Sequence, residues 1–184
     1  DREDQQVLVS TQLDPSDPNT FSFLTKNAAE GVNYGLEVNM TMDLNENVNV
    51  FANLGLLETE IKNWKSRTDL EGRAQAHAPK RSYAVGMNWN PAQNYYLRLD
   101  VTGKSSFYYS DSHDNQSKSY SLTNLSLGYQ KDQWNAEFWI RNAFDRYYSV
   151  RGFYFGNEPP NFQDTLYERH GEPRYSGVSL RYDF

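Results

Sequence analysis

Apolar and polar side chains alternate with a period of two over long segments of the 184-residue chain. The segment 32–43 shows this most clearly. Every even position from Val32 to Met42 is apolar or aromatic, and every odd position from Asn33 to Asp43 is polar or glycine. Because successive side chains of a β-strand point to opposite faces, the pattern predicts a strand with one apolar and one polar face.

The same alternation recurs along the chain, so the sequence predicts about eight antiparallel strands. The other alternating segments are 5–13, 48–56, 82–89, 95–109, 125–129, 134–141 and 175–184. Short turns are expected at 44–47, 90–94 and 131–133, and longer loops at 58–78, 111–118 and 154–170. Short turns at one end of the strands and long loops at the other are the layout of an outer-membrane barrel.

A soluble β-sandwich also alternates apolar and polar residues, but three features favour a membrane barrel. Several alternating segments are ten residues long or more, whereas sandwich strands usually have about five or six residues. The chain ends on Phe184 after apolar residues at 178, 180 and 182. Aromatic residues also lie near the ends of the apolar faces, as in interfacial girdles: Tyr83, Trp89, Tyr95, Tyr109, Tyr129 and Trp134. The predicted fold class is therefore all-β, an antiparallel transmembrane β-barrel.

Composition narrows the function classes without opposing this fold. The mean hydropathy is low, and this is compatible with a barrel, in which only alternate residues face lipid. The net charge of -6 with scattered basic residues argues against nucleic acid as a partner. The absence of cysteine excludes disulfides and thiolate metal sites. No signal peptide is visible at Asp1, so we expect the chain to begin after processing or within a longer protein.

Few residues suggest catalysis or metal binding. Asp43, Asn45 and Asn47 match the first ligands of a calcium loop, but Val48 and Leu54 stand where that loop needs Gly and Glu. The three histidines are far apart in predicted loops, at 77, 113 and 170. No nucleophile elbow accompanies the serine, histidine and aspartate residues. We therefore predict no enzyme, no metal site and no cofactor.

Ionisable residues on the polar strand faces are the more informative set. In a membrane barrel this face points into the lumen, because a charge facing lipid costs a few kcal/mol. The residues predicted to face the lumen are Glu37, Arg98, Asp100, Lys104, Glu137, Arg141, Arg181 and Asp183.

Two parts of the chain resemble a known family. The C-terminal third carries Ile-Arg-Asn-Ala-Phe-Asp-Arg-Tyr-Tyr at 140–148, Arg-Gly-Phe-Tyr-Phe-Gly-Asn at 151–157 and Gly-Glu-Pro-Arg at 171–174 before the closing Phe184. The segment 27–37, with its Gly-Leu-Glu triplet, is similar to an upstream strand of the same proteins, and the two parts stand in the right order. The chain thus resembles the C-terminal end of a TonB-dependent outer-membrane receptor.

The resemblance implies a 22-stranded barrel with an N-terminal plug in its lumen. Such receptors lie in the bacterial outer membrane and import scarce ligands such as ferric siderophores, powered by the TonB complex. Residues 1–184 would be a C-terminal segment of the barrel, with the plug and the TonB-contacting part outside this chain. The implied partners are outer-membrane lipid and lipopolysaccharide, the barrel assembly machinery, the TonB complex and a small-molecule ligand, such as an iron chelate.

Two sets of residues follow from this resemblance. The loop 154–170 is expected to contact ligand, because its aromatic and cationic side chains suit an anionic chelate: Tyr154, Phe155, Tyr167, Arg169 and His170. The final strand is expected to be recognised by the assembly machinery through Tyr175, Gly177, Val178, Leu180, Tyr182 and Phe184.

A second architecture stays open on the sequence alone. Eight strands also suffice for a self-contained outer-membrane barrel that acts as an adhesin, an anchor or a lipid-modifying enzyme. Pairing of the first strand, 5–13, with the last strand would favour that small closed barrel.

Overall fold

A computed structural model describes residues 2–12, 14, 20–65, 67–111, 113–156 and 158–184, with the backbone alone described for 2–12, 21 and 23–29. Its elements are β1 (Arg2–Gln12), β2 (Phe21–Asn45), β3 (Val48–Trp64), the 3₁₀ helix η1 (Thr68–Leu70), β4 (Arg81–Ala92), β5 (Tyr95–Lys104), β6 (Tyr120–Lys131), β7 (Trp134–Arg141), β8 (Ser149–Phe155), β9 (Thr165–His170) and β10 (Tyr175–Tyr182). Over the described ranges, no helix has the length and apolar character needed to span a bilayer.

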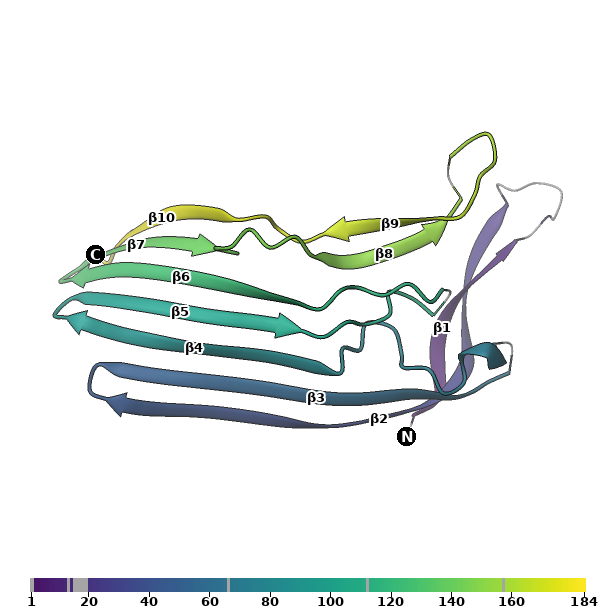
Figure 1. The fold of residues 1–184 in the computed structure, drawn as a ribbon, viewed down its shortest axis with the longest axis horizontal. Coiled ribbons are helices and arrows are strands. Elements are labelled where there is room, and N and C mark those ends of the chain that lie inside the picture. Colours follow the sequence, from purple (N-terminus) through teal and green to yellow (C-terminus); the bar gives the residue numbers. More distant parts are fainter. Residues whose placement is uncertain (1, 13, 15–19, 66, 112, 157) are drawn as a thin grey trace.

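The strands form an open antiparallel sheet. Its order is β1-β2-β3-β4-β5-β6-β7-β10, and β8 and β9 form a separate hairpin. Figure 1 shows tight turns at the left end of the sheet and long connections at the right, where the hairpin lies. Because β1 and β10 occupy opposite edges and do not pair, this chain does not form the self-contained eight-stranded barrel.

The hydrogen-bond register brings the apolar residues of neighbouring strands into common rows. One row crosses six strands, with each residue paired to the next: Met42, Val50, Met87, Leu99, Leu125 and Ile140. Since side chains alternate along each strand, every such row lies on the same face of the sheet. The alternation in the sequence therefore becomes one continuous apolar surface.

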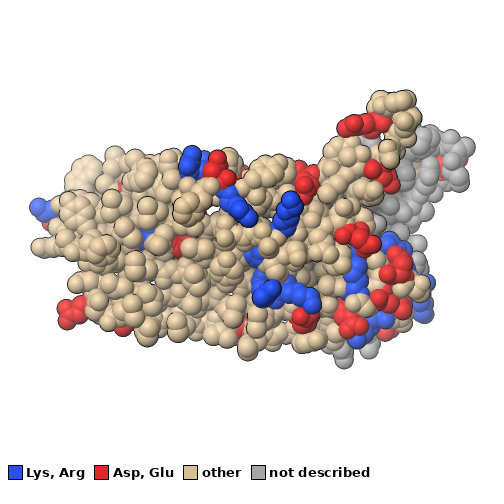
Figure 2. Space-filling model, viewed as in Figure 1, with Lys and Arg blue, Asp and Glu red and all other residues tan. Residues whose placement is uncertain are grey.

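This apolar surface is exposed. Leu36, Leu127 and Leu180 are 58%, 48% and 71% exposed, although each lies well inside a strand. The described buried apolar side chains lie instead near the long-loop end, at Ile61, Trp64, Leu70, Phe107 and Tyr109. Figure 2 shows few charges over the strands and many at the loop end. An exposed apolar band of this extent needs lipid or a partner to cover it.

Aromatic side chains border the band at the short-turn end. Tyr95 and Tyr129 pair across β5 and β6 with ring centroids 4.9 Å apart, and Trp134 and Tyr182 pair across β7 and β10 at 4.8 Å. Phe184 continues this girdle at 5.0 Å from Tyr182. The amphipathic rings suit a membrane–water interface. The prediction that Tyr109 belongs to such a girdle was wrong, since its ring is 3% exposed within the loops.

Strand ends differ from the predictions near the long loops. β3 continues to Trp64, well into the predicted loop 58–78, because residues 57–64 still pair with β2. β5 ends at Lys104, short of the predicted end at 109. The predicted loop 154–170 includes the end of β8 and all of β9. Beyond the apolar band the two faces of a strand no longer differ in what covers them, so the alternation that marks a strand fades.

Glycines on the polar face lie beneath aromatic rings of the neighbouring strand. Gly128 pairs directly with Tyr96, and Gly177 pairs with Trp139. A Cβ atom added at either glycine would overlap the facing ring. Gly86 lies beneath Phe51 in the same way. Close packing therefore requires glycine at these positions. Each aromatic ring lies over the glycine backbone, in the space that a side chain at that position would fill.

Candidate functional site

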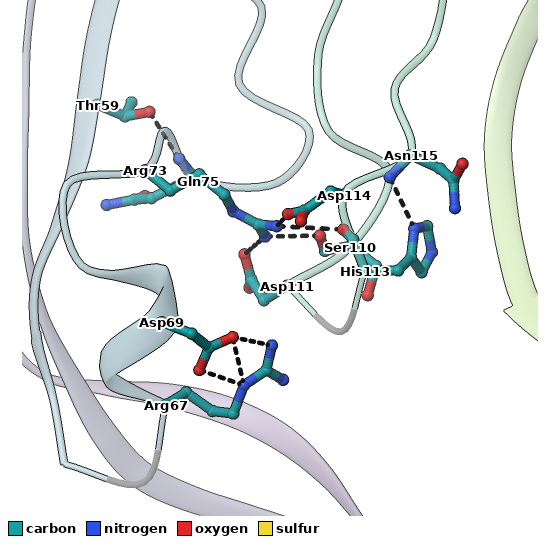
Figure 3. Close-up of polar contacts among 10 residues, drawn as sticks. All are labelled: Thr59, Arg67, Asp69, Arg73, Gln75, Ser110, Asp111, His113, Asp114 and Asn115. Atoms are coloured by element: carbon teal, nitrogen blue, oxygen red, sulfur yellow. Dashed lines mark hydrogen bonds and ion pairs between the residues drawn. The ribbon is translucent and has the colours of Figure 1, made fainter.

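A largely buried arginine side chain joins two connections at the long-loop end of the sheet. Arg73 of the β3–β4 connection reaches the β5–β6 connection, where Nη1 donates to Asp114 Oδ1 at 2.6 Å and to the His113 carbonyl at 3.1 Å. Its Nη2 donates to the Ser110 carbonyl at 2.8 Å and lies 3.4 Å from Asp111 Oδ1 (Figure 3). The guanidinium side chain is 10% exposed. Arg73 therefore ties two loops together and is already neutralised by two carboxylates.

The β3–β4 connection also folds back on β3. The amide of Ile61 donates to the Arg73 carbonyl at 2.9 Å, and the amide of Gly72 donates to the Ile61 carbonyl at 2.8 Å. The Gln75 amide donates to Thr59 Oγ1 at 3.0 Å (Figure 3). These bonds hold the backbone on both sides of Arg73, so the guanidinium is presented from a fixed segment.

A second contact joins the β5–β6 connection to the hairpin. The hydroxyl of buried Tyr109 donates a short hydrogen bond to Glu168 of β9. Burial and then this bond raise the pKa of Tyr109 to about 12, while the hydrogen bond from Tyr109 lowers the pKa of the Glu168 carboxyl. The Tyr109 ring also lies against Gly152 of β8. One face of the hairpin is thus fixed on the neighbouring loop.

His113 lies between the two loops and the hairpin. Its Nδ1 accepts the Asn115 amide at 3.2 Å, and its ring centroid is 5.6 Å from that of Tyr154. Burial lowers the pKa of His113, and the nearby charge of Arg73 lowers it further. The imidazole is therefore held neutral at neutral pH.

The five residues predicted to contact ligand divide between the two faces of the hairpin. Tyr154 contacts His113, and His170 stacks on Tyr147 at 4.2 Å on the side that meets the loop. Phe155 and Tyr167 stack on each other at 5.1 Å on the opposite face. Arg169 pairs with Arg151 and alternates with Glu168, so it shares that opposite face. The structure therefore does not bring all five residues to one site.

The charged residues predicted to face the lumen lie along the polar side of the sheet. Asp100 is buried, accepts the Asn124 amide at 2.8 Å and lies 3.5 Å from Arg98. Glu137 accepts the Tyr96 hydroxyl at 2.8 Å. At the short-turn end Arg181 pairs with Asp183 at 2.8 Å, and Arg141 ends β7 at the other end.

Glu37 and Lys104 line a pocket of about 460 Å³ on the same side of the sheet. Tyr148 and Val150 line it as well, at the entrance to the hairpin. The pocket therefore connects the polar face of the strands with the loop-contacting face of the hairpin.

The residues predicted as an assembly signal lie on both faces of β10. Gly177 pairs with Trp139 and Tyr175 with Arg141 on the polar face, whereas Val178 pairs with Phe138 on the apolar face. Leu180, Tyr182 and Phe184 follow Val178 on the apolar side. Their recognition by an assembly machinery remains a prediction.

Comparison with known proteins decides the family. Residues 1–143 match the family described as TonB dependent receptor-like, beta-barrel. This chain belongs to that family. TonB-dependent receptors are also its neighbours among solved structures, which agrees with the resemblance that the sequence showed.

Three solved structures show the extent of the likeness. The ferric yersiniabactin uptake receptor FyuA from Yersinia pestis matches 88% of this chain with 18% identity and a TM-score of 0.74. The copper transporter OprC matches 99% with 12% identity and a TM-score of 0.74, and the ferric preacinetobactin receptor BauA from Acinetobacter baumannii matches 97% with 19% identity and a TM-score of 0.63. The chain spans 25%, 28% and 26% of these proteins. At such identities the likeness shows the fold of this TonB-dependent receptor segment.

The sequence did not single out the residues that organise the loop end. Arg73, Tyr109 and Glu168 lie where the alternation fades, and no local motif marks their long-range contacts. Tyr109 continues the apolar series of β5 in the sequence. That series was the only sequence signal for Tyr109, and it predicted a place at the membrane interface instead of in the loops. Among the described residues, no three His, Asp or Glu side chains gather as a metal site.

Proposed function

We propose that residues 1–184 are a C-terminal barrel segment of an outer-membrane receptor that takes up a scarce ligand, such as a ferric siderophore. The observation that carries the proposal is an open sheet with an exposed apolar band on one face and charged residues on the other. In a larger closed barrel these faces meet lipid and lumen. FyuA and BauA, which share the fold, are receptors for ferric ligands.

Energy for uptake would come from the TonB complex through a part of the receptor outside these residues. The plug, likewise, would lie outside this chain and pack against the polar face. The full receptor would reside in the bacterial outer membrane, among lipid and lipopolysaccharide, after insertion by the barrel assembly machinery. An exposed apolar band bordered by aromatic residues supports this location.

Ligand contact from the hairpin would involve the face that meets the loop. Tyr154 and His170 lie on this face, and Tyr148 and Val150 at its entrance line the pocket with Glu37 and Lys104. Aromatic and imidazole groups beside a polar pocket suit a ligand that combines rings with polar groups. Phe155, Tyr167 and Arg169 lie on the other face of the hairpin, away from this pocket.

Uptake by cells tests this function. A strain lacking the full-length gene is compared with its complemented strain under iron limitation, with cell-associated iron and copper measured after addition of ferric siderophores or copper. Iron uptake restored by the gene and abolished by loss of TonB supports the proposal. Restored copper uptake alone would replace the ferric ligand with copper, and no uptake of either would contradict the proposal.

The two hairpin faces supply a matched pair of variants for the same assay. We expect Tyr154→Ala with His170→Ala to weaken uptake about tenfold, because both side chains lie on the pocket side. Phe155→Ala with Thr165→Ala changes the opposite face and should leave uptake unchanged. Equal effects of the two double variants would contradict the assignment of faces.

A further inference from the structure

The second face of the hairpin carries two arginines in direct register. Arg151 of β8 is the partner of Arg169 of β9, and both side chains are exposed. Like charges directly opposite each other in a β-ladder destabilise it. Among the described residues, neither arginine takes part in an ion pair, and the adjacent carboxylate of Glu168 is bound by Tyr109 on the other face. The pair therefore lacks an anion.

Aromatic residues surround this cation pair on the same face. The Arg151 guanidinium lies 4.7 Å from the centroid of the Phe153 ring, which holds it beside the hairpin. Phe153 pairs with Tyr167, and Tyr167 stacks on Phe155. Farther toward the tip on this face, the Tyr167 hydroxyl donates to Glu158 at 3.2 Å. Two cations thus lie beside a row of rings in which Phe153 and Phe155 are exposed and Tyr167 is half-buried.

The direction of this face limits what can reach it. The opposite face is occupied by Tyr109 and His113, and the entrance residue Val150 lines the pocket on the polar side of the sheet. Arg151 and Arg169 accordingly lie on the hairpin face that is turned away from the loop and the pocket. A ligand held in the pocket would not meet them.

We propose that Arg151 and Arg169 bind the phosphate of an outer-leaflet lipid headgroup. Guanidinium groups pair with phosphate oxygens through two parallel hydrogen bonds, and two of them in register would neutralise one phosphate. Phe153, Phe155 and Tyr167 would lie against the apolar part of the same lipid. A phosphorylated glycolipid offers both a phosphate for the arginines and acyl chains for the rings, since it presents phosphate at the level just above the acyl chains. This inference rests on the outer-membrane location proposed above.

Native mass spectrometry of the full-length receptor in detergent tests the site. The probes are a diphosphorylated glycolipid and its phosphate-free form. We expect Arg151→Gln with Arg169→Gln to weaken binding of the phosphorylated form about tenfold and to leave the phosphate-free form unchanged. The charge-matched control is Lys131→Gln with Arg181→Gln at the short-turn end, which should bind as the unaltered receptor does. Retention of heat-modifiable mobility on gels confirms that each variant is folded.

Three results would overturn the proposal. The first is unaltered binding of the phosphorylated glycolipid by the Arg151/Arg169 variant. The second is equal binding of the two glycolipid forms by the unaltered receptor, since the rings alone would then account for it. The third is displacement of the lipid by inorganic phosphate at equal concentration, which would indicate a site for a soluble anion. The titration uses neither TonB nor a transported ligand, so its failure is separable from failure of the uptake function.

Discussion

Arg73 shows how one side chain can organise a loop surface. Its contacts with two carbonyls and two carboxylates come from a loop 37–41 residues farther along the chain. It also lies over the Tyr108 ring at 4.4 Å. The planar guanidinium makes these contacts in several directions at once, and a lysine ammonium has fewer donors and no planar face.

We expect Arg73→Ala to loosen the β5–β6 connection by about 1–3 kcal/mol of local opening free energy, because the half-buried carbonyls of Ser110 and His113 lose their donor. Hydrogen exchange of the peptide 108–116 measures this change. Arg67→Ala is the control, since the Arg67–Asp69 ion pair lies within one loop and is exposed to solvent. Faster exchange in the Arg67→Ala control than in Arg73→Ala would contradict the conclusion that Arg73 holds the β5–β6 connection in place.

His113 gives the same loop a dependence on pH. Burial and Arg73 hold its folded-state pKa below the usual value, so the unfolded loop binds the proton more readily. The neutral imidazole therefore stabilises the loop above its ordinary pKa of about 6.5, and this contribution is lost as the pH falls through the lower folded-state value. Protonation also removes the acceptor for the Asn115 amide.

Hydrogen exchange at Asn115, corrected for the intrinsic effect of pH, should show less protection at pH values below the folded pKa of His113. In His113→Gln this loss should be absent, while His77→Gln should behave as the unaltered protein does because His77 is exposed. Equal pH dependence in His113→Gln would assign the effect to another group.

Within each strand, the register determines what a residue faces. Leu99 lies in the middle of an apolar row with Met87 and Leu125, whereas Thr102 pairs with Ala84 and Leu122 on the pocket side. We expect Leu99→Arg to cost about 2–4 kcal/mol, because it would place a charge against the bilayer interior. Thr102→Arg should cost much less, since its face is wet. Urea unfolding of the full-length receptor in lipid vesicles measures both, and equal costs would contradict the orientation of the sheet.

Whether an element could be predicted from the sequence depended on what surrounds it in the structure. Strands that carry the apolar band were predicted from sequence, because one apolar and one polar face impose a period of two on residues such as those of β2 and β4. The ends of β3 and β5 and the β8–β9 hairpin were not, since they lie beyond the apolar band and no such contrast between faces marks them. The contact of Arg73 with Asp114 joins residues 41 apart, and no local spacing encodes it.

At the scale of the molecule, the effect of Phe184 on insertion can be measured separately from its effect on the stability of the sheet. Phe184 is fully exposed, and its described ring contact is with Tyr182. Deleting it should change the stability of the folded receptor by well under about 1 kcal/mol. If the final strand is an assembly signal, the same deletion should lower the amount of receptor inserted in cells.

Heat-modifiable mobility of the receptor in outer-membrane fractions measures insertion, and refolding into vesicles measures stability. Phe184→Trp is the control, because it keeps an aromatic ring at the end of the apolar face. Normal insertion of the deletion variant would contradict the role predicted for the final residue.

The packing of rings over glycines also constrains how the sequence can change over generations. Gly128 tolerates a side chain only if Tyr96 becomes smaller, and Trp139 can shrink only if backbone at Gly177 is covered in another way. Either single mutation is harmful while the matching double mutation is less so, which geneticists call compensatory epistasis. In a saturation library of the receptor, functional variants that change one residue of such a pair should therefore also change its partner. The pair of Phe51 and Gly86 should behave in the same way.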